Sequence, residues 1–162
     1  MSLFAAQSLS LDELLTALDH WVRWGWLRSL DRALVRWQLR QQPDTPAIVL
    51  LLTAFASHQV GRGHVCLDLQ ALLRHSGVTL ALPPERQRLS TEHQALLPER
   101  LLAQSLGTHD LQQYALTSLP LLAAQLRDYS GILQMAETRL YLRRYFDSEQ
   151  RVAAAIRARL QT

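Results

Sequence analysis

The residues of this 162-residue chain whose types could do chemistry together are His58, His64 and Cys66. Imidazole nitrogens and a thiolate bind zinc, and a cysteine beside a histidine base can act as a nucleophile. The spacing His58-x5-His64-x-Cys66 has no second cysteine and no cluster of carboxylates beside it. We therefore expect the cysteine to pack as a small apolar side chain and the histidines to hydrogen-bond to backbone groups. The sequence predicts no catalytic residue and no metal site.

A second group of residues could stack on nucleic acid bases. Four tryptophans near the N-terminus are interleaved with arginines, and the group consists of Trp21, Trp24, Trp26, Trp37, Arg23, Arg28 and Arg36. Aromatic and cationic side chains form the platforms that bind single strands, but they also pack as cation–π pairs on ordinary helix surfaces. Because the formal charge is only +3, we favour packing and expect DNA binding to be weak and salt-sensitive at best.

Nucleotide-driven motors cradle phosphates in a glycine-rich loop that ends in a lysine followed by Ser or Thr. All 17 basic residues of this chain are arginines, so it contains no such lysine. Gly61-Arg62-Gly63 is too short to replace the loop. We therefore expect no cofactor in this chain, neither ATP nor Mg²⁺.

The element that must position these residues is the apolar stretch from Thr45 to Gly77. Five consecutive aliphatic residues from Ile48 leave no polar face, so a helix here should be buried nearly all round. Thr45 is the expected N-cap, and Gly61 is expected to end the helix in the left-handed conformation. A shorter helix capped by Asp68 is expected to follow and to pack back on the first.

Helical periodicity continues on both sides of this stretch. A capping box at Ser10 starts the first helix, and Gly25 ends it. Further helices are expected at residues 92–106, 110–115 and 148–160. Two short strands, Ile132–Met135 and Arg139–Arg143, are predicted to form a hairpin. The predicted fold is mostly α, a compact multi-helix domain of about six helices with one small β-hairpin near the C-terminus.

The second helix is expected to span about Ser29 to Gln41, and two kinds of residue divide its surface. Its apolar stripe consists of Leu30, Ala33, Leu34 and Trp37, and the arginines at positions 28, 32, 36 and 40 lie on the other side. Such an apolar stripe ordinarily faces the core. Arginine-rich helix faces are usually solvated or ion-paired.

Two separated blocks of the sequence resemble one known family. The first is Phe55–His58 with Gly61–Leu67, and the second is Arg139–Tyr145 followed by Glu149 and Val152. Both are similar, in the same order, to the N-terminal region of the RecD subunit of RecBCD, the alpha subunit of exodeoxyribonuclease V. The resemblance extends from about residue 14 to the C-terminus and is weakest between residues 78 and 106.

The resemblance implies one RecD-like N-terminal domain over residues 1–162, with a helical part at 1–128 and the hairpin plus last helix at 129–162. RecD is a 5′-to-3′ ATP-dependent DNA helicase within a helicase–nuclease that acts in double-strand break repair and homologous recombination. Its ATPase motifs follow the region matched here, so the motor domains with their ATP and Mg²⁺ are expected outside this chain. The chain alone is then no enzyme.

The role that the resemblance implies is docking, with RecC-like and RecB-like subunits and the subunit's own downstream helicase motor as partners. Arginine and aromatic side chains are enriched at interfaces and hot spots. The candidate contact residues are Trp24, Trp26, Arg139, Tyr141, Arg143, Arg144 and Tyr145, and we expect several of them to be exposed. The alternative is an accessory single-stranded DNA-binding module, which requires Arg28, Arg32 and Arg36 to converge with the arginines at 139–144.

The chain shows no sign of a membrane partner. Its longest apolar run, Ala47–Ala56, is about half the ~20 residues that cross a bilayer, and no N-terminal segment has the pattern of a signal peptide. A single cysteine suits a reducing compartment. We expect a soluble cytoplasmic protein.

Overall fold

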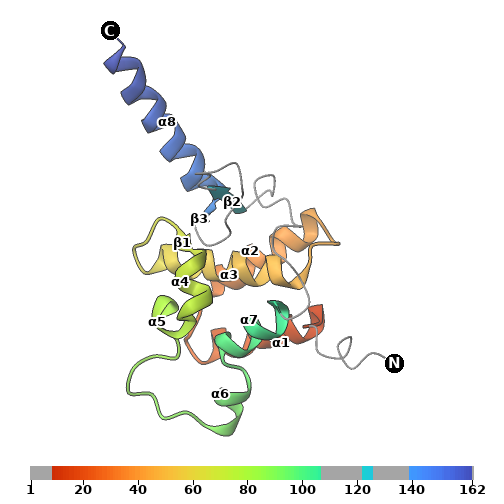
Figure 1. Cartoon of the computed structure of the whole chain (residues 1–162). Coiled ribbons are helices and arrows are strands. Elements are labelled where there is room, and N and C mark those ends of the chain that lie inside the picture. Colours follow the sequence, from red (N-terminus) through yellow and green to blue (C-terminus); the bar gives the residue numbers. More distant parts are fainter. Residues whose placement is uncertain (1–8, 107–121, 126–138, 162) are drawn as a thin grey trace.

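The computed structural model describes residues 9–106, 122–125 and 139–161, and this part of the chain is mostly helical (Figure 1). The helices are α1 (Leu11–Arg23), α2 (Ser29–Gln41), α3 (Ala47–Gly61), α4 (Leu69–Arg74), α5 (Ser76–Leu80), α6 (Thr91–Ala95), α7 (Pro98–Leu106) and α8 (Arg143–Leu160), and the strands are β1 (Leu67–Asp68), β2 (Leu122–Gln125) and β3 (Arg139–Leu142). The predicted fold class, mostly α with a small hairpin near the C-terminus, is confirmed. The predicted helix at 110–115 lies outside the described residues.

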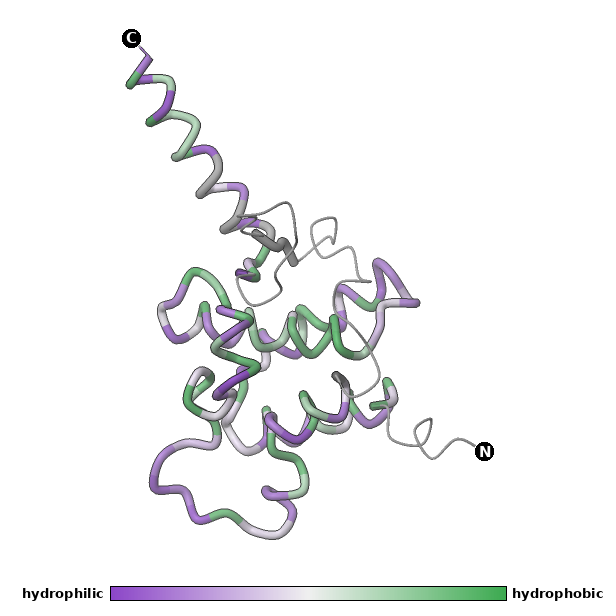
Figure 2. The backbone as a smooth tube through the Cα atoms, in the orientation of Figure 1, coloured by the Kyte–Doolittle hydropathy of each residue, from purple (hydrophilic) through white to green (hydrophobic). Residues whose placement is uncertain are grey.

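Helix α3 is the core of the helical body, residues 11–106. It contacts α1, α2, α5 and α7 as well as β1 and β3. Every side chain from Ile48 to Ser57 is buried, because the aliphatic residues leave no polar face, and the hydrophobic colouring follows the helix (Figure 2). The helix begins one residue later than expected, since Pro46 is the N-cap and the Thr45 hydroxyl instead donates to the Gln42 carbonyl at 2.6 Å.

Side-chain caps at two other helix starts follow the prediction. The Ser10 hydroxyl accepts from the backbone N–H of Glu13 at 3.1 Å, and the Asp68 carboxylate accepts from that of Ala71 at 3.1 Å. Each satisfies a donor that the first helical turn leaves unpaired. Gly25, two residues beyond α1, has a φ of +78° and allows the sharp exit that glycine was expected to provide.

Gly61 does not end α3 in the left-handed conformation, so this prediction is wrong. It is the last helical residue, and the left-handed glycine of this corner is Gly63, with a φ of +91°. A different constraint operates at position 61. A Cβ placed there would lie 2.6 Å from Cζ of Arg28. A side chain at position 61 would therefore require the Arg28 guanidinium to move.

Strand β3 is the middle strand of an antiparallel sheet with the order β1-β3-β2. Leu140 pairs with Leu67 on one side and with Ala124 on the other. The predicted pairing of β3 with Ile132–Met135 is therefore wrong, because Leu122–Gln125 occupies that edge, and residues 132–135 lie outside the described residues. An alanine-rich strand has low β propensity and gave no signal of its own.

Helix α2 has the predicted bounds but buries a different face from the predicted one. Its buried residues are Asp31, Val35 and Gln38. Leu30 and Trp37 of the expected core stripe are instead 53% and 37% exposed. Hydrogen bonds inside the body favour this orientation: the Asp31 carboxylate accepts three, and the Gln38 side-chain N–H group donates to Gln42. The pairing offsets most of the cost of burying these polar groups, although within the described structure Oε1 of Gln38 is buried without a hydrogen-bond partner.

Helix α8 follows β3 without a break and extends away from the helical body, with the C-terminus at its far end (Figure 1). The expected last helix is confirmed, although it begins at Arg143 rather than at Ser148. Strands β2 and β3 are its main contacts. Among the helices that the structure describes, none has the length and hydrophobicity needed to cross a bilayer.

Candidate functional site

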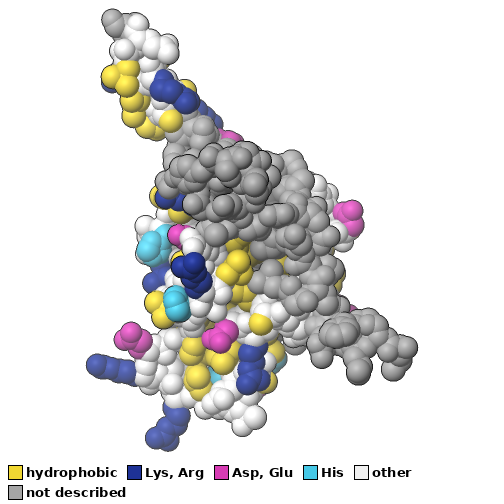
Figure 3. Space-filling view, viewed as in Figure 1, with side chains coloured by type: hydrophobic (Ala, Val, Ile, Leu, Met, Phe, Trp, Pro, Cys, Tyr) yellow, Lys and Arg dark blue, Asp and Glu magenta, His cyan; other side chains and the backbone are white. Residues whose placement is uncertain are grey.

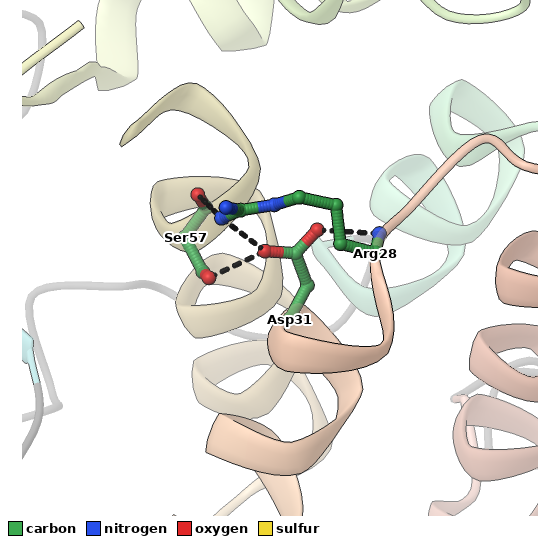
Figure 4. Close-up of polar contacts among 3 residues, drawn as sticks. All are labelled: Arg28, Asp31 and Ser57. Atoms are coloured by element: carbon green, nitrogen blue, oxygen red, sulfur yellow. Dashed lines mark hydrogen bonds and ion pairs between the residues drawn. The ribbon is translucent and has the colours of Figure 1, made fainter. Parts of the chain in front are cut away.

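A buried cluster of polar groups joins α2 to α3 (Figure 4). The fully buried Asp31 carboxylate accepts from the Arg28 backbone N–H at 2.8 Å, from Nη2 of Arg28 at 2.9 Å and from the Ser57 hydroxyl at 2.5 Å. Nη2 of Arg28 also donates to the Ser57 carbonyl at 2.8 Å. Both carboxylate oxygens are therefore occupied by donors of the chain itself. The arrangement suits a structural clamp between the two helices.

Side chains at the end of α3 bind backbone carbonyls at the end of α5. His58 donates through Nε2 to the Leu80 carbonyl at 2.8 Å, and the Thr79 carbonyl accepts from Gln59 at 3.1 Å and from Arg62 at 2.7 Å. Burial lowers the pKa of His58 below 6.5, although the hydrogen bond to Leu80 opposes the shift. His58 therefore hydrogen-bonds backbone, as expected, and is neutral at pH 7.

We predict that His58 makes the folded chain less stable in mild acid. Its pKa is lowered in the folded state, so below about pH 6.5 the unfolded chain takes up the proton more readily. The free energy of unfolding should be constant above that pH and should fall as the pH drops from 6.5 toward the folded pKa. Urea unfolding at pH 7.5, 6.5 and 5.5 measures this. The drop should be smaller in His58→Gln and unchanged in His64→Gln, whose histidine is exposed; equal drops in both variants would contradict the prediction.

The two other residues of the possible metal or thiol site lie on the corner between α3 and β1. His64 is exposed and Cys66 is half-buried. Across the described residues, no group of three or more His, Cys, Asp or Glu side chains is placed to hold a metal ion. Among the residues that the structure describes, these side chains are therefore not part of a metal-binding cluster.

The predicted contact residues near the N-terminus pack into an aromatic cluster. Trp26 is 2% exposed, and its indole N–H donates to Oε1 of Gln87 at 2.7 Å. Trp24 is half-buried, edge-on to Trp26 at 5.0 Å and to His93 at 4.4 Å between ring centroids. The expectation of exposure is wrong for Trp26, because His93 and Trp24 pack against its ring and Gln87 accepts from its indole N–H. Stacking of nucleic acid bases on Trp26 would require these contacts to open.

The predicted contact residues near the C-terminus divide in the same way. Tyr141 is 2% exposed in β3, so the expectation of exposure is wrong for it as well. Its strand is the central one, and its ring is one of the large fully buried side chains. Arg139 is half-buried and Arg144 is exposed, whereas the side chains of Arg143 and Tyr145 lie outside the described part of the structure.

The arginines of α2 that a DNA-binding surface would need are engaged with carboxylates. Arg28 belongs to the buried cluster, and Arg32 and Arg36 both bind Oδ1 of Asp19, at 3.1 and 3.2 Å. A shared acidic partner reduces the positive potential available to phosphates. The observed pairing therefore favours the ion-paired interpretation of this face over the nucleic-acid one.

Exposed apolar side chains mark two surfaces that the sequence interpretation missed. On α8, Val152, Ile156 and Leu160 are 60%, 54% and 81% exposed. On α2, the exposed residues are those of the stripe that was expected to face the core. The sequence contained one sign of this: Asp31 and Gln38 share a second face of the helix, and that face is the one buried against the core. A helix with two candidate stripes buries only one of them.

A model of the family described as the N-terminal domain of the RecBCD enzyme subunit RecD matches residues 23–141. No curated protein and no solved structure matches the chain. The matched segment runs from the last residue of α1 to β3, well over half of the sequence, and it ends before α8. The chain therefore belongs to the family of N-terminal domains of the RecBCD enzyme subunit RecD.

Proposed function

We propose that this chain is the non-catalytic docking domain of a RecD-like helicase subunit in a RecBCD exodeoxyribonuclease V complex. In this role it holds the subunit against RecC-like and RecB-like subunits and against its own downstream helicase motor, in the cytoplasm, during double-strand break repair and homologous recombination. Family membership implies the complex, and the lack of lysine leaves ATP and Mg²⁺ to the motor.

The observation that carries the proposal is the apolar row on α8. Val152, Ile156 and Leu160 recur every four residues, so they lie along one side of the helix. Figure 3 shows hydrophobic and basic side chains beside one another on the part of α8 that extends away from the helical body. Because transfer of apolar surface out of water contributes roughly 25 cal/mol per Å², a row held in solvent favours association with another surface.

Co-purification with purified RecB-type and RecC-type subunits from the same source tests the proposal. We expect the chain to form a complex with them, and Ile156→Glu to weaken it by about tenfold or more, because a carboxylate would enter the apolar interface. Ala154→Glu is the matched control, since its exposed side chain lies on the opposite side of α8. Both variants should keep the native melting temperature.

Two results would overturn the proposal. One is the failure of the unmodified chain to form the complex. The other is nanomolar binding to single-stranded DNA at physiological salt, which would favour the accessory DNA-binding module; the docking role predicts weak binding that falls steeply with salt.

A further inference from the structure

Helix α2 presents an apolar surface outward, which we call the α2 stripe: Leu30, Ala33, Leu34 and Trp37. Leu30 is 53% and Trp37 is 37% exposed, Ala33 is exposed and Leu34 is half-buried. A helix on the surface of a globular protein ordinarily turns such a stripe toward the core. Here the reverse orientation occurs within the segment that the family model matches.

The orientation of α2 is fixed by polar contacts on its inner face. Asp31 is bound to Arg28 and Ser57, and the Gln38 amide donates to Thr45 at 3.4 Å and to Gln42 at 3.1 Å. Turning the stripe inward would bring Asp31 and Gln38 into water and break these contacts. The folded body therefore holds the helix that carries the stripe in place, which reduces the ordering cost of binding.

The spacing of the stripe is that of a helix that lies in a groove. Positions 30, 33, 34 and 37 are i, i+3, i+4 and i+7, the anchor pattern of helix-in-groove recognition, over about 10 Å of helix at 1.5 Å per residue. Tryptophan is the residue type most enriched among interface hot spots. Trp37 is therefore the anchor expected to contribute most.

Arginine side chains along one edge of the α2 stripe indicate the charge expected on the partner surface that meets that edge. At about 100° per residue, Arg36 and Arg40 lie next to Ala33 along the same edge of the stripe. Arg40 is exposed and makes no hydrogen bond or ion pair with another described residue, and Arg36 shares Asp19 with Arg32. A partner surface that meets this edge gains from carboxylates there.

We propose that the α2 stripe docks into an apolar groove of a folded protein partner, with acidic side chains along the rim that faces Arg40. This inference rests on the proposed docking function and adds a second contact to the one made by α8. The partner is defined by this chemistry, a hydrophobic channel with one negatively charged edge.

Binding of the full chain to the purified RecB-type and RecC-type subunit pair tests the inference. Leu30→Ser combined with Trp37→Ser should weaken binding by about tenfold or more, and should lower the melting temperature only slightly, because both side chains are partly exposed and lie outside the core cluster. Arg40→Glu should weaken binding and reduce its dependence on salt. Arg23→Glu is the charge-matched control, since Arg23 is exposed on α1, outside the stripe.

The possible outcomes separate this inference from the proposed function. If the unmodified chain does not bind, the docking function itself fails. If it binds and the stripe variant binds equally well, docking stands and the α2 stripe is not its surface. Unchanged binding of Arg40→Glu overturns the acidic rim. Sedimentation that shows the chain to dimerise through Trp37 would assign the stripe to a second copy and overturn the groove.

Discussion

Replacing Asp31 with alanine is expected to lower the free energy of unfolding by about 3 kcal/mol. The carboxylate is fully buried and accepts three hydrogen bonds that tie the start of α2 to α3. Its removal leaves the Ser57 hydroxyl and the Arg28 N–H without their acceptor inside the body. The cost stays below the upper range for buried ion pairs because the Arg28 side chain is 45% exposed and can turn to water. Urea unfolding of the two proteins measures the difference.

Two further variants make the test specific. Asp31→Asn should be almost as destabilising as Asp31→Ala, since an amide presents an N–H group to donors that need an acceptor. Asp44→Ala should change stability by less than about 0.5 kcal/mol, because Asp44 is exposed in the loop before α3. Equal effects of Asp31→Ala and Asp44→Ala would show that the cluster does not clamp the helices.

Replacing Gly61 with alanine is expected to destabilise the native chain by about 2 kcal/mol and to have the opposite sign once Arg28 is removed. The new Cβ would lie 2.6 Å from the guanidinium carbon, so the guanidinium must move away from Asp31 and from the Ser57 carbonyl. In an Arg28→Ala background that conflict is absent. Alanine is there the better helix former, and Gly61→Ala should stabilise by up to about 1 kcal/mol.

A double-mutant cycle with Arg28→Ala, Gly61→Ala and the double variant measures this coupling by urea unfolding. Gly77→Ala is not a suitable control, because a Cβ there would lie 3.3 Å from the Leu82 carbonyl. Additive effects of Arg28→Ala and Gly61→Ala would contradict the proposed packing. If the backbone conformation at position 61 were the cause instead, Gly61→Ala would lower the free energy of unfolding equally in the native and the Arg28→Ala backgrounds.

Local composition determined the features that the sequence predicts well. Ile48 and the four aliphatic residues after it leave no polar face, so a helix that contains them is buried all round, and the bounds of α2 follow from its periodicity and from Pro43. Asp68 caps its helix through a donor three residues away. In each case the partners lie within one or two turns, so the pattern contains the information.

Partners distant in the sequence determined the features that it predicts poorly. Helix α2 has two faces with equally good helical spacing, the α2 stripe and the face formed by Asp31, Val35 and Gln38. Which face is buried depends on Ser57 of α3, which donates to Asp31. The indole N–H of Trp26 donates to Gln87, which lies on a loop beyond α5. No local rule links these positions, so the candidate contact surface shifted from the aromatic residues to the exposed stripes.

The central place of β3 in the sheet affects how the chain folds while it is being synthesised. Leu67 and its partner Leu140 are about seventy residues apart, whereas α1, α2 and α3 lie within the first sixty or so residues. The N-terminal helices can therefore pack while synthesis continues, but the surface of α3 that β3 covers stays open until residue 142 has left the exit tunnel. A nascent or truncated chain that stops before Arg139 leaves β1 with an unpaired edge beside apolar surface. Chaperone capture of this intermediate would protect it from aggregation until the last strand arrives.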